Sequence, residues 1–134
     1  MRVLVLTSEP ITAELLRDAV GTEVADNAEV LVVAPALHWS GLRFWMSDAD
    51  EAIAKAEDVQ VETVERLEEE GVDAAGDTGE SEPLLAIQDA LATFAADRIV
   101  VVSHPESERA FAEEDVDAAR ARFDVPVEFW TVTR

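Results

Sequence analysis

The chain alternates short apolar segments that favour β-strands with longer amphipathic segments that favour helices, and this alternation constrains its fold most. Strands are expected at 2–6, 29–34, 72–76, 98–102 and 125–132. The first two are continuous apolar runs, typical of parallel strands that are covered on both faces. The third is diluted by an aspartate and two alanines, whereas the fifth alternates its apolar positions. The pattern predicts a sheet enclosed by helices.

Four amphipathic segments separate the strands. The first helix is expected to begin near Pro10, the second to extend from a capping-box sequence at Ser47 to Gly71, the third to begin at Pro83, and the fourth to cover 113–123. We predict 76–82 to be a turn that caps the third helix. The apolar faces are predicted at Ile11, Leu15 and Ala19; at Ala49, Ile53, Ala56, Gln60, Val64 and Leu67; at Leu84, Ile87, Leu91 and Phe94 or Ala95; and at Val116, Ala119 and Phe123.

Alternating strands and helices predict a single α/β domain over 1–134, with helices on both faces of a parallel sheet. We expect a three-layer sandwich with five strands in the order 3-2-1-4-5. Ligands of such sheets bind beyond the carboxyl ends of the strands, where the strand order reverses. The candidate ligand-binding residues are therefore those near these ends: Thr7, Ser8, Pro35, Gly76, Asp77, Ser103 and His104.

Composition excludes several classes of function. The formal net charge of −20 opposes binding to nucleic acid or to an anionic membrane, because both need phosphates neutralised by Lys and Arg. The absence of cysteine excludes disulfides and thiolate sites. No apolar run approaches the roughly 20 residues that span a bilayer, and the first residues lack a signal-peptide pattern. We expect a cytoplasmic protein whose acidic surface suits a salt-rich cytoplasm.

Local motifs add little chemistry. The segment 76–81 lacks the Gly-Lys-Ser/Thr ending of a phosphate loop. His38 and His104 each follow a predicted strand, but no His/Glu spacing indicates a metal site. His104 is the better candidate for ligand contact, because it lies where the strand order is expected to reverse.

The segment Trp39–Met46 places five large apolar residues between two predicted elements. It either folds back over the domain or forms a lid or a surface for a protein partner, since Trp, Met and Arg are enriched at interfaces.

The order of elements resembles the universal stress protein (UspA-like) family over nearly the whole chain. The segments that carry the resemblance are Val5-Leu6-Thr7-Ser8-Glu9-Pro10, Ala34-Pro35, the helix at 47–70, Gly76-Asp77, Ala96-Asp97-Arg98-Ile99-Val100 and Pro126-Val127. The resemblance implies an adenine nucleotide alpha hydrolase-like fold.

The family's ATP-binding members carry a glycine-rich loop after the fourth strand, and this chain has no glycine between Ser103 and Phe123. Glycine lets backbone amides approach phosphate closely. Thr7 or Ser8 also stands where the family has an aspartate. By resemblance we expect a non-catalytic regulatory or interaction module that does not bind ATP tightly, with ATP or AMP disfavoured as ligands. The alternatives are a small-ligand or nucleotide sensor at the ends of strands 1 and 4, and a small hydrolase that uses His104.

A homodimer through the fifth strand is expected, because this strand lies at the sheet edge, where unpaired N–H and C=O groups invite a partner. Stress proteins often pair in this way, so the resemblance favours the same interface. The alternative is a monomer with Trp130 folded onto its own fourth helix. The predicted interface residues are Val127, Phe129, Trp130 and Val132.

Overall fold

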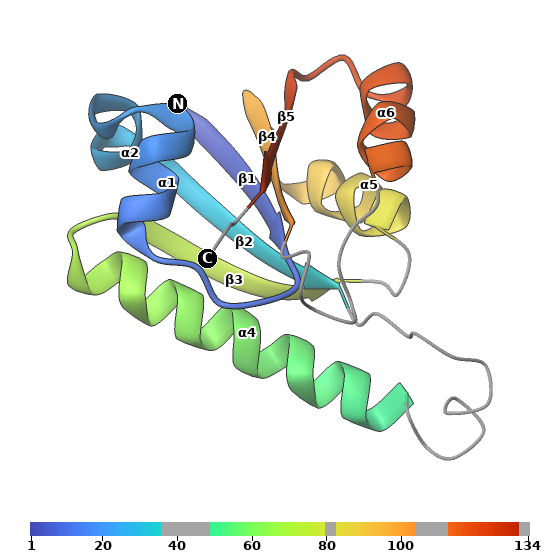
Figure 1. Ribbon diagram of the computed structural model, residues 1–134, viewed down its shortest axis with the longest axis horizontal. Coiled ribbons are helices and arrows are strands. Elements are labelled where there is room, and N and C mark those ends of the chain that lie inside the picture. The colour runs from blue at the N-terminus through green and yellow to red at the C-terminus, as the bar shows by residue number, and fades with distance from the viewer. Residues whose placement is uncertain (36–48, 80–82, 104–112, 132–134) are drawn as a thin grey trace.

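The computed structural model describes residues 1–35, 49–79, 83–103 and 113–131. Five parallel strands form one sheet in the order β3-β2-β1-β4-β5 (Figure 1). The predicted strand order and direction are therefore confirmed. The strands are β1 (Arg2–Thr7), β2 (Glu29–Pro35), β3 (Asp73–Gly79), β4 (Arg98–Ser103) and β5 (Val127–Thr131).

Helices cover both faces of the sheet, which makes the domain a three-layer sandwich. Alternate residues of the central strand supply the two cores: Val3 and Val5 belong to the first, and Leu4 and Leu6 to the second. The first core is closed by α1 (Ala13–Val20), α2 (Thr22–Asn27) and α4 (Ala49–Glu69). The second is closed by α5 (Pro83–Thr93) and α6 (Glu113–Arg122).

The first predicted helix is divided and shifted. The α1 helix begins at Ala13 because Thr12 caps it, its Oγ1 accepting a hydrogen bond of 3.2 Å from the Leu15 N–H. Gly21, with φ of 94°, ends α1 and precedes α2, which was not predicted. Of the predicted stripe, Ile11 is buried, and Leu15 and Ala19 are only partly buried against the first core. The fully buried residues of α1 are instead Ala13, Leu16 and Val20.

The long helix α4 buries a different set of residues from the predicted one. Val59 and Thr63 are buried although neither was predicted, whereas Ile53 is 45% exposed. In Figure 1, the first turns of α4 extend past the carboxyl ends of β2 and β3. Ala56 and Leu67 are buried as predicted.

The third strand is longer than predicted, and the turn expected at 76–82 is wrong over 76–79. The β2 strand pairs with β3 along its full length, so that Asp77 lies opposite Val33 and Gly79 opposite Pro35. Residues 80–82 lie outside the described part of the chain.

The α5 and α6 helices agree better with the sequence. Ile87, Val116 and Ala119 are buried, and Phe123 packs against the same second core. The last strand is shorter than predicted at both ends, and Val132 lies outside the described residues.

Candidate functional site at the carboxyl ends of β1 and β4

Three predicted residues meet where the strand order reverses. Thr7 pairs with Val102 across β1 and β4, so the next residues along the two strands are Ser8 and Ser103. Their exposed fractions are 0% for Thr7, 5% for Ser8 and 4% for Ser103. We call Thr7, Ser8 and Ser103 the switch-point cluster. It places buried hydroxyl groups at the position where sheets of this kind bind ligands.

Within this cluster, Thr7 and Ser8 have different hydrogen-bonding states. Thr7 Oγ1 donates a hydrogen bond of 2.6 Å to the Glu9 carbonyl and accepts one of 3.4 Å from the Glu9 N–H. Ser8 Oγ is buried and has no hydrogen-bond partner among the described residues. A buried hydroxyl without a partner costs about 1 to 3 kcal/mol. Ser8 is therefore a polar group that a ligand could satisfy.

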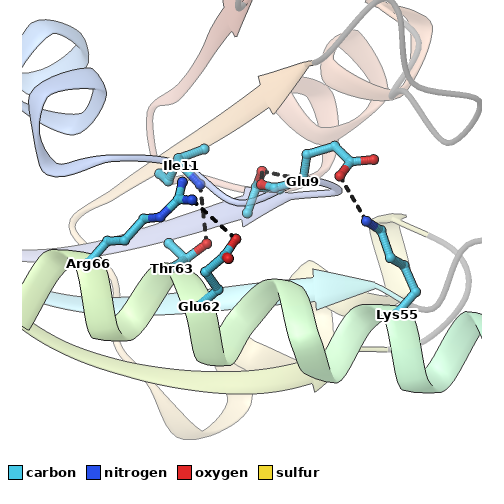
Figure 2. A network of polar contacts seen from close by, with 7 residues as sticks. Glu9, Ile11, Lys55, Glu62, Thr63 and Arg66 are labelled. Carbon is cyan, nitrogen blue, oxygen red and sulfur yellow. Dashed lines mark hydrogen bonds and ion pairs between the residues drawn. The ribbon is translucent and has the colours of Figure 1, made fainter.

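The loop that follows Ser8 contacts α4 through one ion pair and one hydrogen bond, both of which Figure 2 shows. Glu9 Oε2 lies 3.0 Å from Lys55 Nζ in an ion pair. The Ile11 N–H donates a buried hydrogen bond of 3.2 Å to Thr63 Oγ1. The loop therefore has one buried anchor and one partly exposed anchor on the same helix.

Glu9, Lys55 and Thr63 were not predicted as part of the site. Lys55 carries a signal that was available in the sequence, since it is the only lysine beside nine arginines. Thr63 is a polar residue on the buried side of an amphipathic helix. A buried polar side chain of this kind usually has a specific partner.

Other predicted site residues lie apart from the switch-point cluster. Gly76 and Asp77 are in β3, which β2 separates from β1, and Asp77 is exposed. Neither residue is at a strand end, because β3 continues to Gly79. Pro35 is the last residue of β2. His104, like His38 and the segment 39–46, lies outside the described residues.

A depression of about 400 Å³ lies at the opposite, amino edge of the sheet. Its charged groups already have partners: Arg2 forms an ion pair with Glu29 at 3.3 Å, and the Arg2 N–H donates to Asp97 at 2.9 Å. This open surface was not predicted, and its lining is exposed. It is lined by Met1, Arg2, Asn27, Glu29, Ala95 and Asp97.

Within the described ranges, no cluster of three or more His, Cys, Asp or Glu side chains could hold a metal ion. No helix in the same part of the chain is both long enough and apolar enough to cross a membrane.

The edge strand β5 divides its side chains between the two cores. Val127 and Phe129 contact the second core, on the side of α5 and α6, and half-buried Trp130 packs against the first. The predicted alternative placed Trp130 on the fourth helix, and this placement is wrong, since α6 covers the other face.

Comparison with known proteins identifies the fold. No protein-family model and no curated protein sequence matches the chain. The structure is similar to that of a universal stress protein from Archaeoglobus fulgidus, with a TM-score of 0.64, 19% identity, and coverage of 96% of this chain and 93% of the other. It is equally similar to the structure of the universal stress protein from Archaeoglobus fulgidus in complex with dAMP, with a TM-score of 0.63, 19% identity, and coverage of 96% and 97%. The chain therefore has the fold of these stress proteins.

Proposed function

We propose that the chain is a non-catalytic regulatory module of the universal stress protein kind, and that it responds to a small ligand at the switch-point cluster. The observation that carries this proposal is the buried Ser8 Oγ, which has no hydrogen-bond partner among the described residues. A ligand hydroxyl or amide that hydrogen-bonds to this group would recover part of the cost of burying it. The similar Archaeoglobus structure in complex with dAMP makes a nucleotide-like ligand the first class to test.

ATP is expected to bind weakly. The stretch between Ser103 and Phe123 contains no glycine, so side chains would hinder the close approach of backbone amides to three phosphates. The net charge of −20 adds repulsion of a highly charged anion. A ligand with less negative charge suits this chain better.

The proposal is tested by measuring melting temperature with 2′-deoxyadenosine, dAMP and ATP. A ligand present at about 100 times its Kd should stabilise the protein by about 2.7 kcal/mol. We expect 2′-deoxyadenosine or dAMP to raise the melting temperature more than ATP does. Replacement of Ser8 by alanine should remove most of this rise.

A matched control is Thr93→Ala, which removes a hydroxyl that donates to the Ala90 carbonyl in α5, away from the switch-point cluster. It should leave the ligand-induced rise unchanged. The proposal would be rejected if none of the three ligands stabilised the protein, or if the Ser8→Ala protein bound them as well as the unaltered protein does.

A further inference from the structure

We propose that Lys55 binds the phosphate of a nucleotide-like ligand, by exchanging its ion pair with Glu9 for one with the ligand. This inference rests on the proposed function, because it requires a ligand at the switch-point cluster. It adds Lys55 as a residue that contacts the negatively charged group of that ligand.

Lys55 lies at the correct edge of the sheet for this role. The α4 helix follows β2 and precedes β3, so its first turns lie at the carboxyl edge and its last turns at the amino edge. Lys55 Nζ contacts Glu9 Oε2 at 3.0 Å, and Glu9 directly follows Ser8 in the chain. Figure 2 shows the Lys55 side chain extending from α4 toward the Glu9 carboxylate.

Most of the other described cations lie toward the amino ends of the strands, and Arg66 lies farther along α4 than Lys55, with its guanidinium near Ile11 in Figure 2. Arg2 and Arg98 are the first residues of β1 and β4. Arg66 lies in the last turn of α4, and Arg120 and Arg122 lie in the last turn of α6. Arg17 donates a hydrogen bond to the carbonyl of Glu70, just after α4. Among the described residues, Lys55 is thus the cation at the carboxyl edge. In a chain with a net charge of −20, an anionic ligand needs such a local positive charge.

The ion pair of Lys55 is suited to exchange. Its side chain is 42% exposed and that of Glu9 is 29% exposed, and ion pairs of this kind contribute only about 0 to 1 kcal/mol. A phosphate carries more negative charge than a carboxylate and accepts charge-assisted hydrogen bonds from an ammonium group. A lysine side chain is flexible and donates from a compact charge, so it can turn from one anion to the other.

The loop would keep its place during this exchange. The buried hydrogen bond from the Ile11 N–H to Thr63 Oγ1 does not involve Lys55 or Glu9. Loss of the Lys55–Glu9 ion pair would therefore not detach the loop from α4.

The experiment compares dAMP with 2′-deoxyadenosine, which differ only in the phosphate, by calorimetric titration of the full chain at constant ionic strength. The unaltered protein should prefer dAMP. Lys55→Gln should weaken dAMP binding by about tenfold and leave 2′-deoxyadenosine binding unchanged, because one charged hydrogen bond is lost. Glu9→Gln should strengthen dAMP binding several-fold, because Lys55 is then no longer held by a carboxylate.

Two further variants serve as controls. Arg66→Gln removes the same charge from the same helix, where Arg66 pairs with Glu62 at 3.4 Å, and should change neither affinity. Lys55→Arg keeps the charge and should keep the preference for dAMP.

The two proposals fail in different ways. If Lys55→Gln weakened the binding of both ligands equally, the proposed contact between Lys55 and the phosphate would be wrong, while the ligand site would still be supported. If neither dAMP nor 2′-deoxyadenosine bound the unaltered protein, the proposed function would be rejected, and the role of Lys55 with it.

Discussion

Thr7 and Ser8 are adjacent in sequence and both are buried, yet their hydroxyl groups contribute to stability in opposite ways. Thr7 Oγ1 closes a local turn by bonding to the Glu9 carbonyl, whereas Ser8 Oγ has no partner within the described part of the chain. A hydrogen bond that is made contributes to the folded state, and an unpaired buried hydroxyl opposes it. In the switch-point cluster, Thr7 therefore stabilises the fold, whereas the Ser8 hydroxyl is available to hydrogen-bond to a ligand.

Ser8→Ala is expected to raise the free energy of unfolding of the ligand-free protein by about 1 kcal/mol, because it removes an unpaired buried hydroxyl. Thr7→Val, which has nearly the same shape, should lower that free energy by about 1 to 2 kcal/mol, because the bond to the Glu9 carbonyl is lost. Urea unfolding measures both changes. Equal losses in the two variants would show that Ser8 Oγ has a partner in the ligand-free protein.

At the scale of elements, β3 and α4 approach each other closely at Gly76. A Cβ atom added there would lie 1.8 Å from Gln60 Oε1 and 2.9 Å from Gln60 Cδ, so the Gln60 side chain occupies the space that a larger residue would need. A glycine in a strand often marks such a close approach. Gly76 is thus explained by helix packing, and not by a turn.

Gly76→Ala should lower the free energy of unfolding by no more than about 1 kcal/mol, because the flexible end of the Gln60 side chain must move but can turn aside. The same substitution in a Gln60→Ala background should cost less, since the side chain that it meets has been removed. Denaturant unfolding of the two single variants and the double variant forms a complete cycle. Additive losses would contradict a direct contact between positions 60 and 76.

At the scale of the whole molecule, charge is the dominant feature. Twenty net negative charges on one small domain repel each other, and salt screens that repulsion. The melting temperature should therefore rise from low to molar concentrations of potassium chloride. A melting temperature that stayed constant or fell over this range would show that the self-repulsion does not limit stability.

We also propose a homodimer formed by antiparallel pairing of two β5 strands. The structure places β5 at the edge of the described sheet, and the strand offers half-buried Phe129 and Trp130 there. The Val127 carbonyl already accepts a hydrogen bond of 3.0 Å from Arg120 Nε, so pairing would use backbone groups farther along the strand. Light scattering at high salt should give a dimeric mass, and Trp130→Asp should reduce it to that of a monomer. Phe94→Ala, at a partly buried position beside the second core, is a control for a general loss of core packing and should leave the dimer intact.

The sequence alone was sufficient for the layers, the parallel sheet and the order of the strands. The layers and the parallel sheet follow from local periodicity and from the alternation of elements, because burial on one or both faces of an element repeats with the period of that element. The order of the strands is not a local property, and it is the order of the fold that the resemblance implied. The placement of Thr7, Ser8 and Ser103 also followed, since parallel strands end at a common edge.

Tertiary structure alone decided the features that depend on contacts between distant residues. The full length of β3 depends on its pairing with β2, and the Lys55–Glu9 ion pair joins residues 46 positions apart. Whether Ser8 Oγ has a partner depends on every group packed around it. Local periodicity reports which side of an element is buried, but not which atom of another element it meets, and for that physical reason these features were missed.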